Sequence, residues 1–185
     1  GKILAAVVTV LAVLAMLPFA ASAEEPVKNG WYSDKGYYEY FQDGYQCKNG
    51  EHYISESNAY FRFDSEGRMY ENEWYRDPET NNWYYYKAGG FRATDCVQAI
   101  NGYYYGFAYN GVMYDDTDFS LYSYETGNWN HYRATAGGPL VVSRWIYTED
   151  SKYEQGGYYK YYGADGAAYR GIQQVDGVYY HFYDD

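Results

Sequence analysis

The feature of this chain that most limits its possible folds is a short aromatic run that recurs seven times along 185 residues. In six of the seven copies a glycine follows the run, and successive glycines lie 23, 23, 21, 27 and 28 residues apart. The runs and their glycines are Tyr37–Tyr40 with Gly44, Tyr60–Phe63 with Gly67, Trp83–Tyr86 with Gly90, Tyr104–Phe107 with Gly111, Trp129–Tyr132 with Gly137-Gly138, Tyr159–Tyr162 with Gly166, and Tyr179–Phe182 with no glycine after it. A period in the twenties predicts a repeat array, in which each small unit buries its apolar face against its neighbours.

Within one repeat, counting back from the glycine assigns each aromatic residue to a face. In the third copy Trp83 is at position −7, Tyr85 at −5 and Tyr86 at −4 relative to Gly90. Because alternate residues of a strand face opposite ways, positions −6 and −4 are predicted to be buried and positions −7 and −5 to face outward. The residues expected to be most strongly buried are Tyr40, Phe63, Tyr86 and Phe107. An aromatic residue recurs at the outward position −7, where it either packs on the next unit or lines a groove for a ligand.

The turns of the repeat are short and polar. Asp-Gly and Asn-Gly pairs such as Asp165-Gly166 are strong hairpin signals. They predict that each aromatic strand pairs with the segment after the glycine, such as Arg68–Tyr70 or Ala167–Tyr169, and Asn101-Gly102 and Asp176-Gly177 mark further turns. Since no helical periodicity appears after residue 23, the predicted fold class is all-β. We expect a β-hairpin repeat solenoid of about seven units, preceded by a helical signal peptide.

The composition supports thin units rather than a thick globular core. After residue 23 the chain contains 42 Phe, Trp and Tyr residues but only 13 Leu, Ile and Val. Aromatic rings suit two-stranded units, because a large flat ring covers a neighbour while a Tyr hydroxyl stays in water. A disordered matrix protein rich in Tyr and Gly is the alternative, and the regular glycine spacing argues against it.

Residues 1–23 are predicted to be a secretory signal peptide. Lys2 is followed by a long apolar stretch, and Ala21-Ser22-Ala23 forms a small-x-small cleavage site. A transmembrane anchor is the competing interpretation, because the apolar stretch is long enough to span a bilayer, but Pro18 near its end favours cleavage. We therefore expect a secreted, cell-wall-associated protein at the cell surface. Its repeat array is residues 24–185, with no membrane contact after the signal peptide is removed.

The formal net charge of −11 argues against two classes of partner. Loss of Lys2 with the signal peptide leaves 13 basic against 25 acidic side chains, which is a net charge of −12. Nucleic acids and anionic membranes attract basic surfaces, so neither is an expected partner.

The remaining reactive side chains predict neither catalysis nor a cofactor. His52, His131 and His181 fall in different repeats, and no motif for a nucleophile, zinc or a phosphate accompanies them. No catalytic residue, metal site or cofactor is therefore predicted. Cys47 and Cys96 lie in repeats one and three at non-equivalent positions, so the sequence leaves open whether they form a disulfide.

The region near the end of the chain carries a recognisable pattern. Residues 158–180 contain an aromatic run, a turn with Asp165-Gly166, the pair Gly171-Ile172, a second turn with Asp176-Gly177 and the next aromatic run. This pattern resembles the cell-wall-binding repeats of Gram-positive surface proteins, a family that includes choline-binding modules, glucan-binding domains and the C-terminal repeats of clostridial toxins. The resemblance implies a β-hairpin solenoid that attaches a secreted protein to envelope polymers or sugars.

The same resemblance implies where a ligand binds. In choline-binding members, adjacent hairpins build a cage in which one Trp follows the glycine, a second Trp opens the aromatic run and a Tyr completes it, sometimes with a Met. The best match is Trp74 followed by Trp83 and Tyr85, with Met69 nearby. Trp83 and Tyr85 are two apart on a strand, so both are expected to face outward, with Trp74 folded over them. Stacked ring faces attract a quaternary ammonium group.

A second groove is expected at Trp145, Tyr159 and Tyr161. Glu73 replaces the usual Gly before Trp74, and later repeats lack the paired tryptophans, so stacking on sugar rings fits the sequence as well as choline binding does. The predicted partner is therefore a cell-wall polymer, such as choline-bearing teichoic acid, or a glycan. Two alternatives stay open: the tryptophans only seal hairpin contacts, or the protein is a structural or adhesive surface protein that acts through protein–protein contact or self-association.

Overall fold

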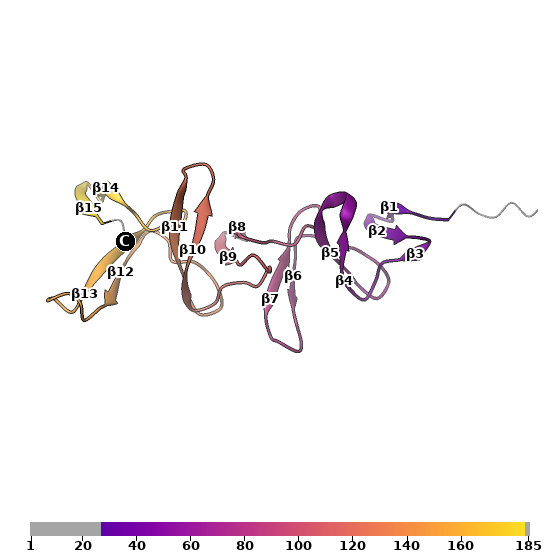
Figure 1. Ribbon diagram of the computed structural model, residues 1–185, viewed down its shortest axis with the longest axis horizontal. Helices are drawn as coiled ribbons and strands as arrows, with labels where there is room; N and C mark the ends of the chain where they lie inside the picture. The colour runs from indigo at the N-terminus through magenta and orange to yellow at the C-terminus, as the bar shows by residue number, and fades with distance from the viewer. Residues whose placement is uncertain (1–26, 184–185) are drawn as a thin grey trace, which may run out of the picture.

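The structure is a computed structural model that describes residues 27–183, and it is all-β. Seven antiparallel hairpins follow one another along an elongated array and project to different sides of its long axis (Figure 1). Numbered one to seven in chain order, the hairpins are β1 (Gly30–Asp34) with β2 (Tyr37–Gln42) and the short β3 (Tyr45–Gln46); β4 (Gly50–Ile54) with β5 (Ala59–Phe63), joined by the 3-10 turn η1 (Ser55–Ser57); β6 (Glu73–Arg76) with β7 (Trp83–Tyr86); β8 (Cys96–Ile100) with β9 (Tyr103–Phe107); β10 (Thr117–Ser123) with β11 (Asn128–Ala134); β12 (Arg144–Glu149) with β13 (Gly157–Tyr162); and β14 (Gly171–Val175) with β15 (Val178–Phe182). The predicted β-hairpin repeat fold is confirmed. The predicted signal peptide, residues 1–23, lies outside the described residues.

Each aromatic run forms the second strand of a hairpin, but the predicted strand partner is wrong. In hairpin three, Trp83–Tyr86 pairs with the preceding segment Glu73–Arg76. The segment after the glycine, which we expected to be the partner strand, makes a single bridge to the aromatic strand, as between Met69 and Phe63. The physical reason is that the glycine turn sends the chain on toward the neighbouring hairpin, so only one residue remains in register.

Two-residue turns close three of the hairpins. Asn101 and Gly102 have φ angles of 51° and 84°, and Asp176 and Gly177 have φ angles of 48° and 84°. Positive φ at both central residues defines the type I′ turn, whose twist matches that of the flanking strands. Both of these turns were predicted from the sequence, and Lys35-Gly36 closes hairpin one in the same way.

Hairpin one is shifted by one residue relative to the others. Trp31 pairs with Tyr40 in the same way as Trp74 pairs with Tyr85. Tyr40 therefore holds position −5 of its repeat, although it is four residues before Gly44. By the same shift, the residue at position −7 of hairpin one is Tyr38.

One backbone hydrogen bond joins neighbouring hairpins at five successive junctions. The residue two after the glycine donates its amide N–H to the carbonyl oxygen at position −7 of the preceding hairpin, with N to O distances of 2.8 to 3.2 Å. The donor and acceptor pairs are Met69 with Tyr38, Arg92 with Tyr60, Met113 with Trp83, Leu140 with Tyr104, and Ala168 with His131. Position −7 is therefore part of the seam between units, and its side chain lies beside the neighbouring hairpin.

The repeated glycine is required by both conformation and space. Gly90 and Gly138 have φ angles of 77° and 96°, which a residue with a Cβ adopts only with strain. A Cβ on Gly90 would overlap the side chain of Met69, and a Cβ on Gly138 would overlap that of Met113. The glycine therefore lets each turn pack directly on the residue two positions after the preceding repeat glycine.

The predicted core residues are buried. Tyr40, Phe63, Tyr86 and Phe107 expose 6%, 1%, 1% and 0% of their surface. The prediction that position −6 is buried throughout is wrong, because Phe61 is buried there but Tyr180 is exposed. Position −6 lies two residues closer to the hairpin tip than position −4, where the neighbouring hairpin covers it less.

The core is divided into separate clusters rather than being continuous. One cluster joins hairpins one and two, and contains Tyr40, Cys47, Ile54, Phe61 and Phe63. A second joins hairpins three and four around Phe107, with Trp74 and Cys96 packed against it. Cys47 and Cys96 are free thiols in different clusters, and burial raises the pKa of each. Such division is expected of an array whose units contact mainly their neighbours.

Candidate ligand-binding grooves

Three tryptophans occupy one equivalent position in the array. Trp31, Trp74 and Trp145 are each the second residue of the first strand of a hairpin. Each pairs across the hairpin with a tyrosine, and these partners are Tyr40, Tyr85 and Tyr161. The tryptophan side chain is thus placed on the same face of its hairpin in all three repeats.

Each of these tryptophans reaches over the next hairpin with nearly the same geometry. The ring centroid of Trp74 lies 5.0 Å from Tyr85 of its own hairpin, and 4.9 Å from Tyr105 and 5.8 Å from Phe107 of the next one. The corresponding distances for Trp145 are 5.2, 4.9 and 5.6 Å, to Tyr161, Tyr180 and Phe182. Those for Trp31 are 4.9, 4.9 and 6.1 Å, to Tyr40, Phe61 and Phe63. We call the contacts of hairpins one with two, three with four and six with seven the tryptophan junctions.

The middle tryptophan junction contains a groove of about 290 Å³ lined by Trp74, Trp83, Tyr105 and Met113. Trp83 stands edge-on to Trp74 at 6.1 Å and is 37% exposed, so the structure brings the two predicted tryptophans together. Tyr85 does not face outward as predicted: it is 7% exposed, because Trp74 covers its ring. The wall that we assigned to Tyr85 is instead formed by Tyr105 and Met113 of the next hairpin.

The first tryptophan junction contains a similar groove of about 310 Å³, which the sequence analysis missed. Trp31, Tyr38, Phe61, Met69 and Phe91 contribute to its lining. Met69, which we placed near Trp74, lies against Trp31 instead. The signal that could have found this groove is the methionine two residues after a repeat glycine, since Met69 and Met113 both follow that rule.

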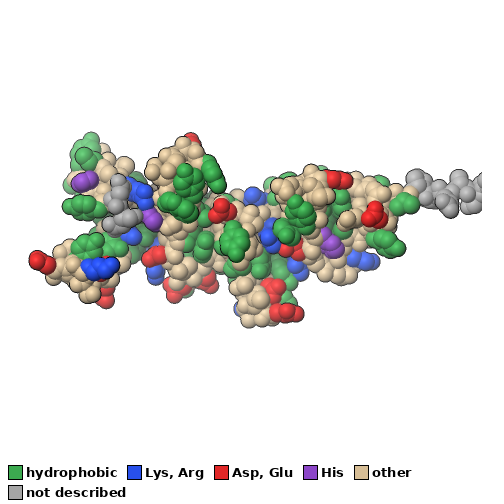
Figure 2. All heavy atoms as spheres, viewed as in Figure 1, with side chains coloured by type: hydrophobic (Ala, Val, Ile, Leu, Met, Phe, Trp, Pro, Cys, Tyr) green, Lys and Arg blue, Asp and Glu red, His purple; other side chains and the backbone are tan. Residues whose placement is uncertain are grey.

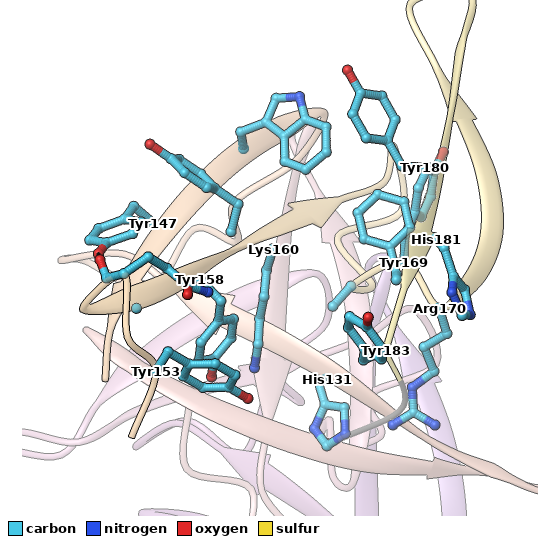
Figure 3. Close-up of a pocket in the computed structure, with 16 residues that line it drawn as sticks. His131, Tyr147, Tyr153, Tyr158, Lys160, Tyr169, Arg170, Tyr180, His181 and Tyr183 are labelled. Atoms are coloured by element: carbon cyan, nitrogen blue, oxygen red, sulfur yellow. The ribbon is translucent and has the colours of Figure 1, made fainter. Parts of the chain in front are cut away.

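The last tryptophan junction opens into the largest of the three junction grooves, of about 650 Å³. Trp145 and Tyr159, both predicted, line it with Tyr180, and Tyr159 is 64% exposed. Tyr161, which was also predicted to line this groove, does not: it is half-buried between Trp145 and Tyr169, at ring-centroid distances of 5.2 and 5.0 Å. Figure 3 shows tyrosines on both sides of this opening, with Tyr147 and Tyr158 on one side and Tyr169 and Tyr180 on the other.

Two other junctions place an acidic residue where the tryptophan would stand. Glu51 pairs across hairpin two with Arg62, and Asp118 pairs across hairpin five with Arg133. We call the contacts of hairpins two with three and five with six the acidic junctions. At these junctions the next hairpin contributes a tyrosine at position −4, Tyr86 or Tyr162. At the tryptophan junctions the same position holds phenylalanine, namely Phe63, Phe107 and Phe182.

The first acidic junction is closed by hydrogen bonds. Glu51 accepts a hydrogen bond of 2.7 Å from the Tyr86 hydroxyl and pairs with the Arg92 guanidinium at 2.6 Å. Arg92 stands two residues after its glycine, which is the position that Met69 and Met113 hold at the tryptophan junctions. Burial, followed by the nearby Glu51 carboxylate, raises the pKa of Tyr86. The acidic junction therefore holds hairpins together with polar contacts in place of stacked rings.

The chemistry that the tryptophan grooves offer is stacking rather than group transfer. Exposed ring faces and edges bind apolar sugar faces and quaternary ammonium groups. Figure 2 shows hydrophobic side chains on the visible surface along the length of the array, interrupted by charged ones. Among residues 27–183 no three His, Cys, Asp or Glu side chains come together in a way that could hold a metal ion. The same residues include no helix long and apolar enough to cross a membrane.

Known structures share this fold. Choline binding protein F from Streptococcus pneumoniae superimposes with a TM-score of 0.57 at 22% sequence identity, over 84% of this chain and 50% of that protein. Alternansucrase in complex with isomaltotriose superimposes with a TM-score of 0.50 at 21% identity, over 61% of this chain and 10% of the enzyme. These likenesses establish the fold, which is the hairpin array seen in choline-binding proteins.

One curated protein resembles the chain at the sequence level. Glucosyltransferase-S of Streptococcus mutans serotype c is 31% identical over 150 residues, which is 80% of this chain and 9% of the enzyme. The chain thus spans a small part of that relative and half of choline binding protein F. No protein-family model matches the chain. The resemblance to choline- and glucan-binding repeats that the sequence suggested is confirmed.

Proposed function

We propose that the chain is a cell-surface binding module without catalytic activity of its own, which attaches to a cell-wall polymer or glycan through its tryptophan junctions. The observation that carries this proposal is the near-identical ring geometry at Trp31, Trp74 and Trp145. Each of these junctions opens a groove beside exposed aromatic side chains. Contacts that only sealed hairpins together would be equally well served by the polar closure that Glu51 makes with Tyr86 and Arg92.

The class of ligand follows from the rings and from the relatives. Aromatic platforms bind either quaternary ammonium groups, as in choline, or the apolar faces of sugars. The solved relative is named for choline binding, and the curated relative is a glucosyltransferase. Choline-bearing teichoic acid and a neutral glucan are therefore the two ligands to compare for this chain.

Repetition compensates for weak single sites. Each groove is shallow and offers a few rings, so one stacking contact contributes on the order of 1 kcal/mol. Three grooves spaced along one array can engage successive units of the same polymer, which raises the overall affinity without new contacts. Residues 24–185 are proposed to act in this way after secretion, with residues 1–23 removed as the signal peptide.

The test replaces exposed groove rings and spares the core. Trp83→Ala and Tyr159→Ala, combined in one variant, remove one ring from each of two grooves. The matched control is Trp129→Ala, since Trp129, on hairpin five, is 56% exposed and is not among the residues that line the three grooves. Tyr85, which is buried, is left intact because its loss would disturb the fold.

We expect the double variant to lose at least about tenfold in affinity for bacterial envelopes, a change that corresponds to 1.4 kcal/mol. The control variant is expected to bind like the unmodified protein, and both should unfold at similar denaturant concentrations. Full envelope binding by the double variant would contradict the proposal. Self-association that depends on concentration and needs no polymer would favour the adhesive alternative instead.

A further inference from the structure

The groove between hairpins six and seven differs from the other two in its charge. His131, Lys160, Arg170 and His181 all contribute to its lining, together with many tyrosines. No Asp or Glu is among the residues that line it within the described part of the chain. In a chain with a net charge of −11, a groove that gathers basic side chains and excludes carboxylates is a local exception.

The other grooves set the contrast. The groove at Trp74 is lined by uncharged residues, and the groove at Trp31 includes Glu71 but no basic residue. A further hollow beside Asp116, Asp118 and Arg133 contains both signs of charge, and Arg133 pairs there with both carboxylates. Among the three tryptophan grooves, and within the described residues, basic side chains line only the one at Trp145.

Lys160, one of the basic side chains of this groove, is held by a ring rather than by an acid. The Lys160 ammonium lies 5.3 Å from the ring centroid of Tyr158, which packs against Tyr153 at 5.2 Å. Within the described residues, neither Lys160 nor Arg170 has a carboxylate within ion-pair distance. An ammonium over a ring is positioned while its remaining donors stay available to a ligand.

The arrangement of these groups suits an extended ligand. Figure 3 shows the side chains of Lys160, His131 and Arg170 running toward the same lower side of the view, while Tyr180 stands at the upper side. His131 accepts or donates a hydrogen bond of 2.6 Å with Ser120, which fixes its ring. Ring platforms and basic groups therefore lie along one groove of about 650 Å³.

We propose that the groove between hairpins six and seven binds an anionic carbohydrate polymer, with sugar or polyol units against Tyr159 and Tyr180 and acidic groups paired with Lys160 and Arg170. This inference rests on the proposed function and gives one of its grooves a distinct ligand chemistry. Phosphodiester and carboxylate groups would both satisfy the basic side chains, since each presents oxygen acceptors to lysine and arginine. The negative charge of the rest of the chain would repel such a polymer elsewhere, which directs it to this groove.

The test uses four defined probes: a poly(glycerol phosphate) chain, an oligogalacturonate, the neutral isomaltotriose and choline. The variant Lys160→Gln with Arg170→Gln removes the two basic groups while keeping polar side chains. The control variant Lys48→Gln with Lys152→Gln makes the same change in net charge at two exposed lysines outside the groove. Asp184 and Asp185, which follow Tyr183 outside the described residues, stay in both variants, so their charges are common to the comparison.

We expect at least one anionic probe to bind the unmodified protein, with an affinity that falls as ionic strength rises. The Lys160 and Arg170 variant should lose about tenfold or more in that affinity, while isomaltotriose binding and the control variant stay unchanged. The anionic probe that binds shows whether the acidic groups of the ligand are phosphodiesters or carboxylates.

Two results would overturn the inference. One is equal loss in both variants, which would assign the effect to overall charge. The other is failure of both anionic probes to bind. If isomaltotriose and choline fail to bind while an anionic probe binds through Lys160 and Arg170, the basic groove stands and the proposed function of the neutral grooves fails.

Discussion

The tryptophan junctions and the acidic junctions differ in the residue at one position of the repeat, which is an aromatic ring in the first and a carboxylate in the second. Trp74 leaves a groove between hairpins three and four, with ring edges exposed beside Trp83. Glu51, at the equivalent position of hairpin two, fills the seam with bonds to Tyr86 and Arg92. The backbone hydrogen bond between hairpins is the same at both kinds of junction.

This difference shows that the array is not a uniform stack of binding units. The backbone seam sets how hairpins join, and the side chain at this one position decides whether aromatic rings or charged groups line the joint. The partner residues change with it: phenylalanine at position −4 accompanies tryptophan, and tyrosine accompanies the acid. Binding capacity is therefore expected at three of the six junctions rather than at every repeat.

The largest effect is expected from Trp74→Ala. Trp74 packs against Tyr85, Tyr105 and Phe107, so its removal opens a cavity between two hairpins. Loss of a packed tryptophan costs about 3–5 kcal/mol of unfolding free energy. Chemical denaturation followed by circular dichroism measures this cost, with the exposed Trp129→Ala as the control. Equal stability of the two variants would mean that Trp74 is not a packing residue.

A smaller loss is expected from Glu51→Ala at the acidic junction. The change leaves Arg92, whose side chain is 12% exposed, without its carboxylate and deprives the Tyr86 hydroxyl of its acceptor. Losing hydrogen bonds to a charged group in this setting costs about 2–3 kcal/mol. Glu66→Ala, which removes an exposed partner of Arg68, is the control and is expected to cost about 0.5 kcal/mol. If the two variants unfold at the same denaturant concentration, the hydrogen bonds of Glu51 stabilise the fold no more than an exposed ion pair does.

The smallest effect is confined to alkaline conditions and concerns Tyr162. Burial, followed by the nearby Asp118, raises the pKa of Tyr162 to about 12 from the ordinary 10.0. A raised pKa in the folded state means that the contribution to stability is full below pH 10 and is lost as the pH rises toward about 12. Tyr162→Phe removes the titrating group and should lessen the loss of stability over that range. Tyr124→Phe, at an 89% exposed tyrosine, should not, and a comparable gain there would contradict the assignment.

Features that depend on neighbouring residues in the sequence were predictable. The aromatic runs form strands, and the turns at Asn101-Gly102 and Asp176-Gly177 form as expected, because strand alternation and turn preference act over a few residues. The partner strand was predicted wrongly because segments such as Cys96–Ile100 carry no aromatic signal, while the glycine after each run resembles a hairpin turn.

Features that depend on how hairpins stack were less predictable. Trp74 and Trp83 meet as expected, but the burial of Tyr85 follows from the way Trp74 folds over its own hairpin. Met69 was assigned to the wrong tryptophan, and the groove at Trp31 was missed, because one repeat does not reveal which neighbour supplies its third wall. The sequence does contain one signal for these junctions, because each junction tryptophan is accompanied by a phenylalanine at position −4 of the next hairpin.

The most direct test of the central claim is the methyl NMR spectrum of the methionines during ligand titration. Met69 lies in the groove at Trp31 and Met113 in the groove at Trp74, while Met16 belongs to the predicted signal peptide outside the described residues. We expect choline or isomaltotriose to shift both methyl resonances in a saturable way, because a ligand among the rings changes the field at each methyl group. If the protein binds bacterial envelopes while neither ligand moves either resonance, the tryptophan junctions are packing contacts and the ligand binds elsewhere.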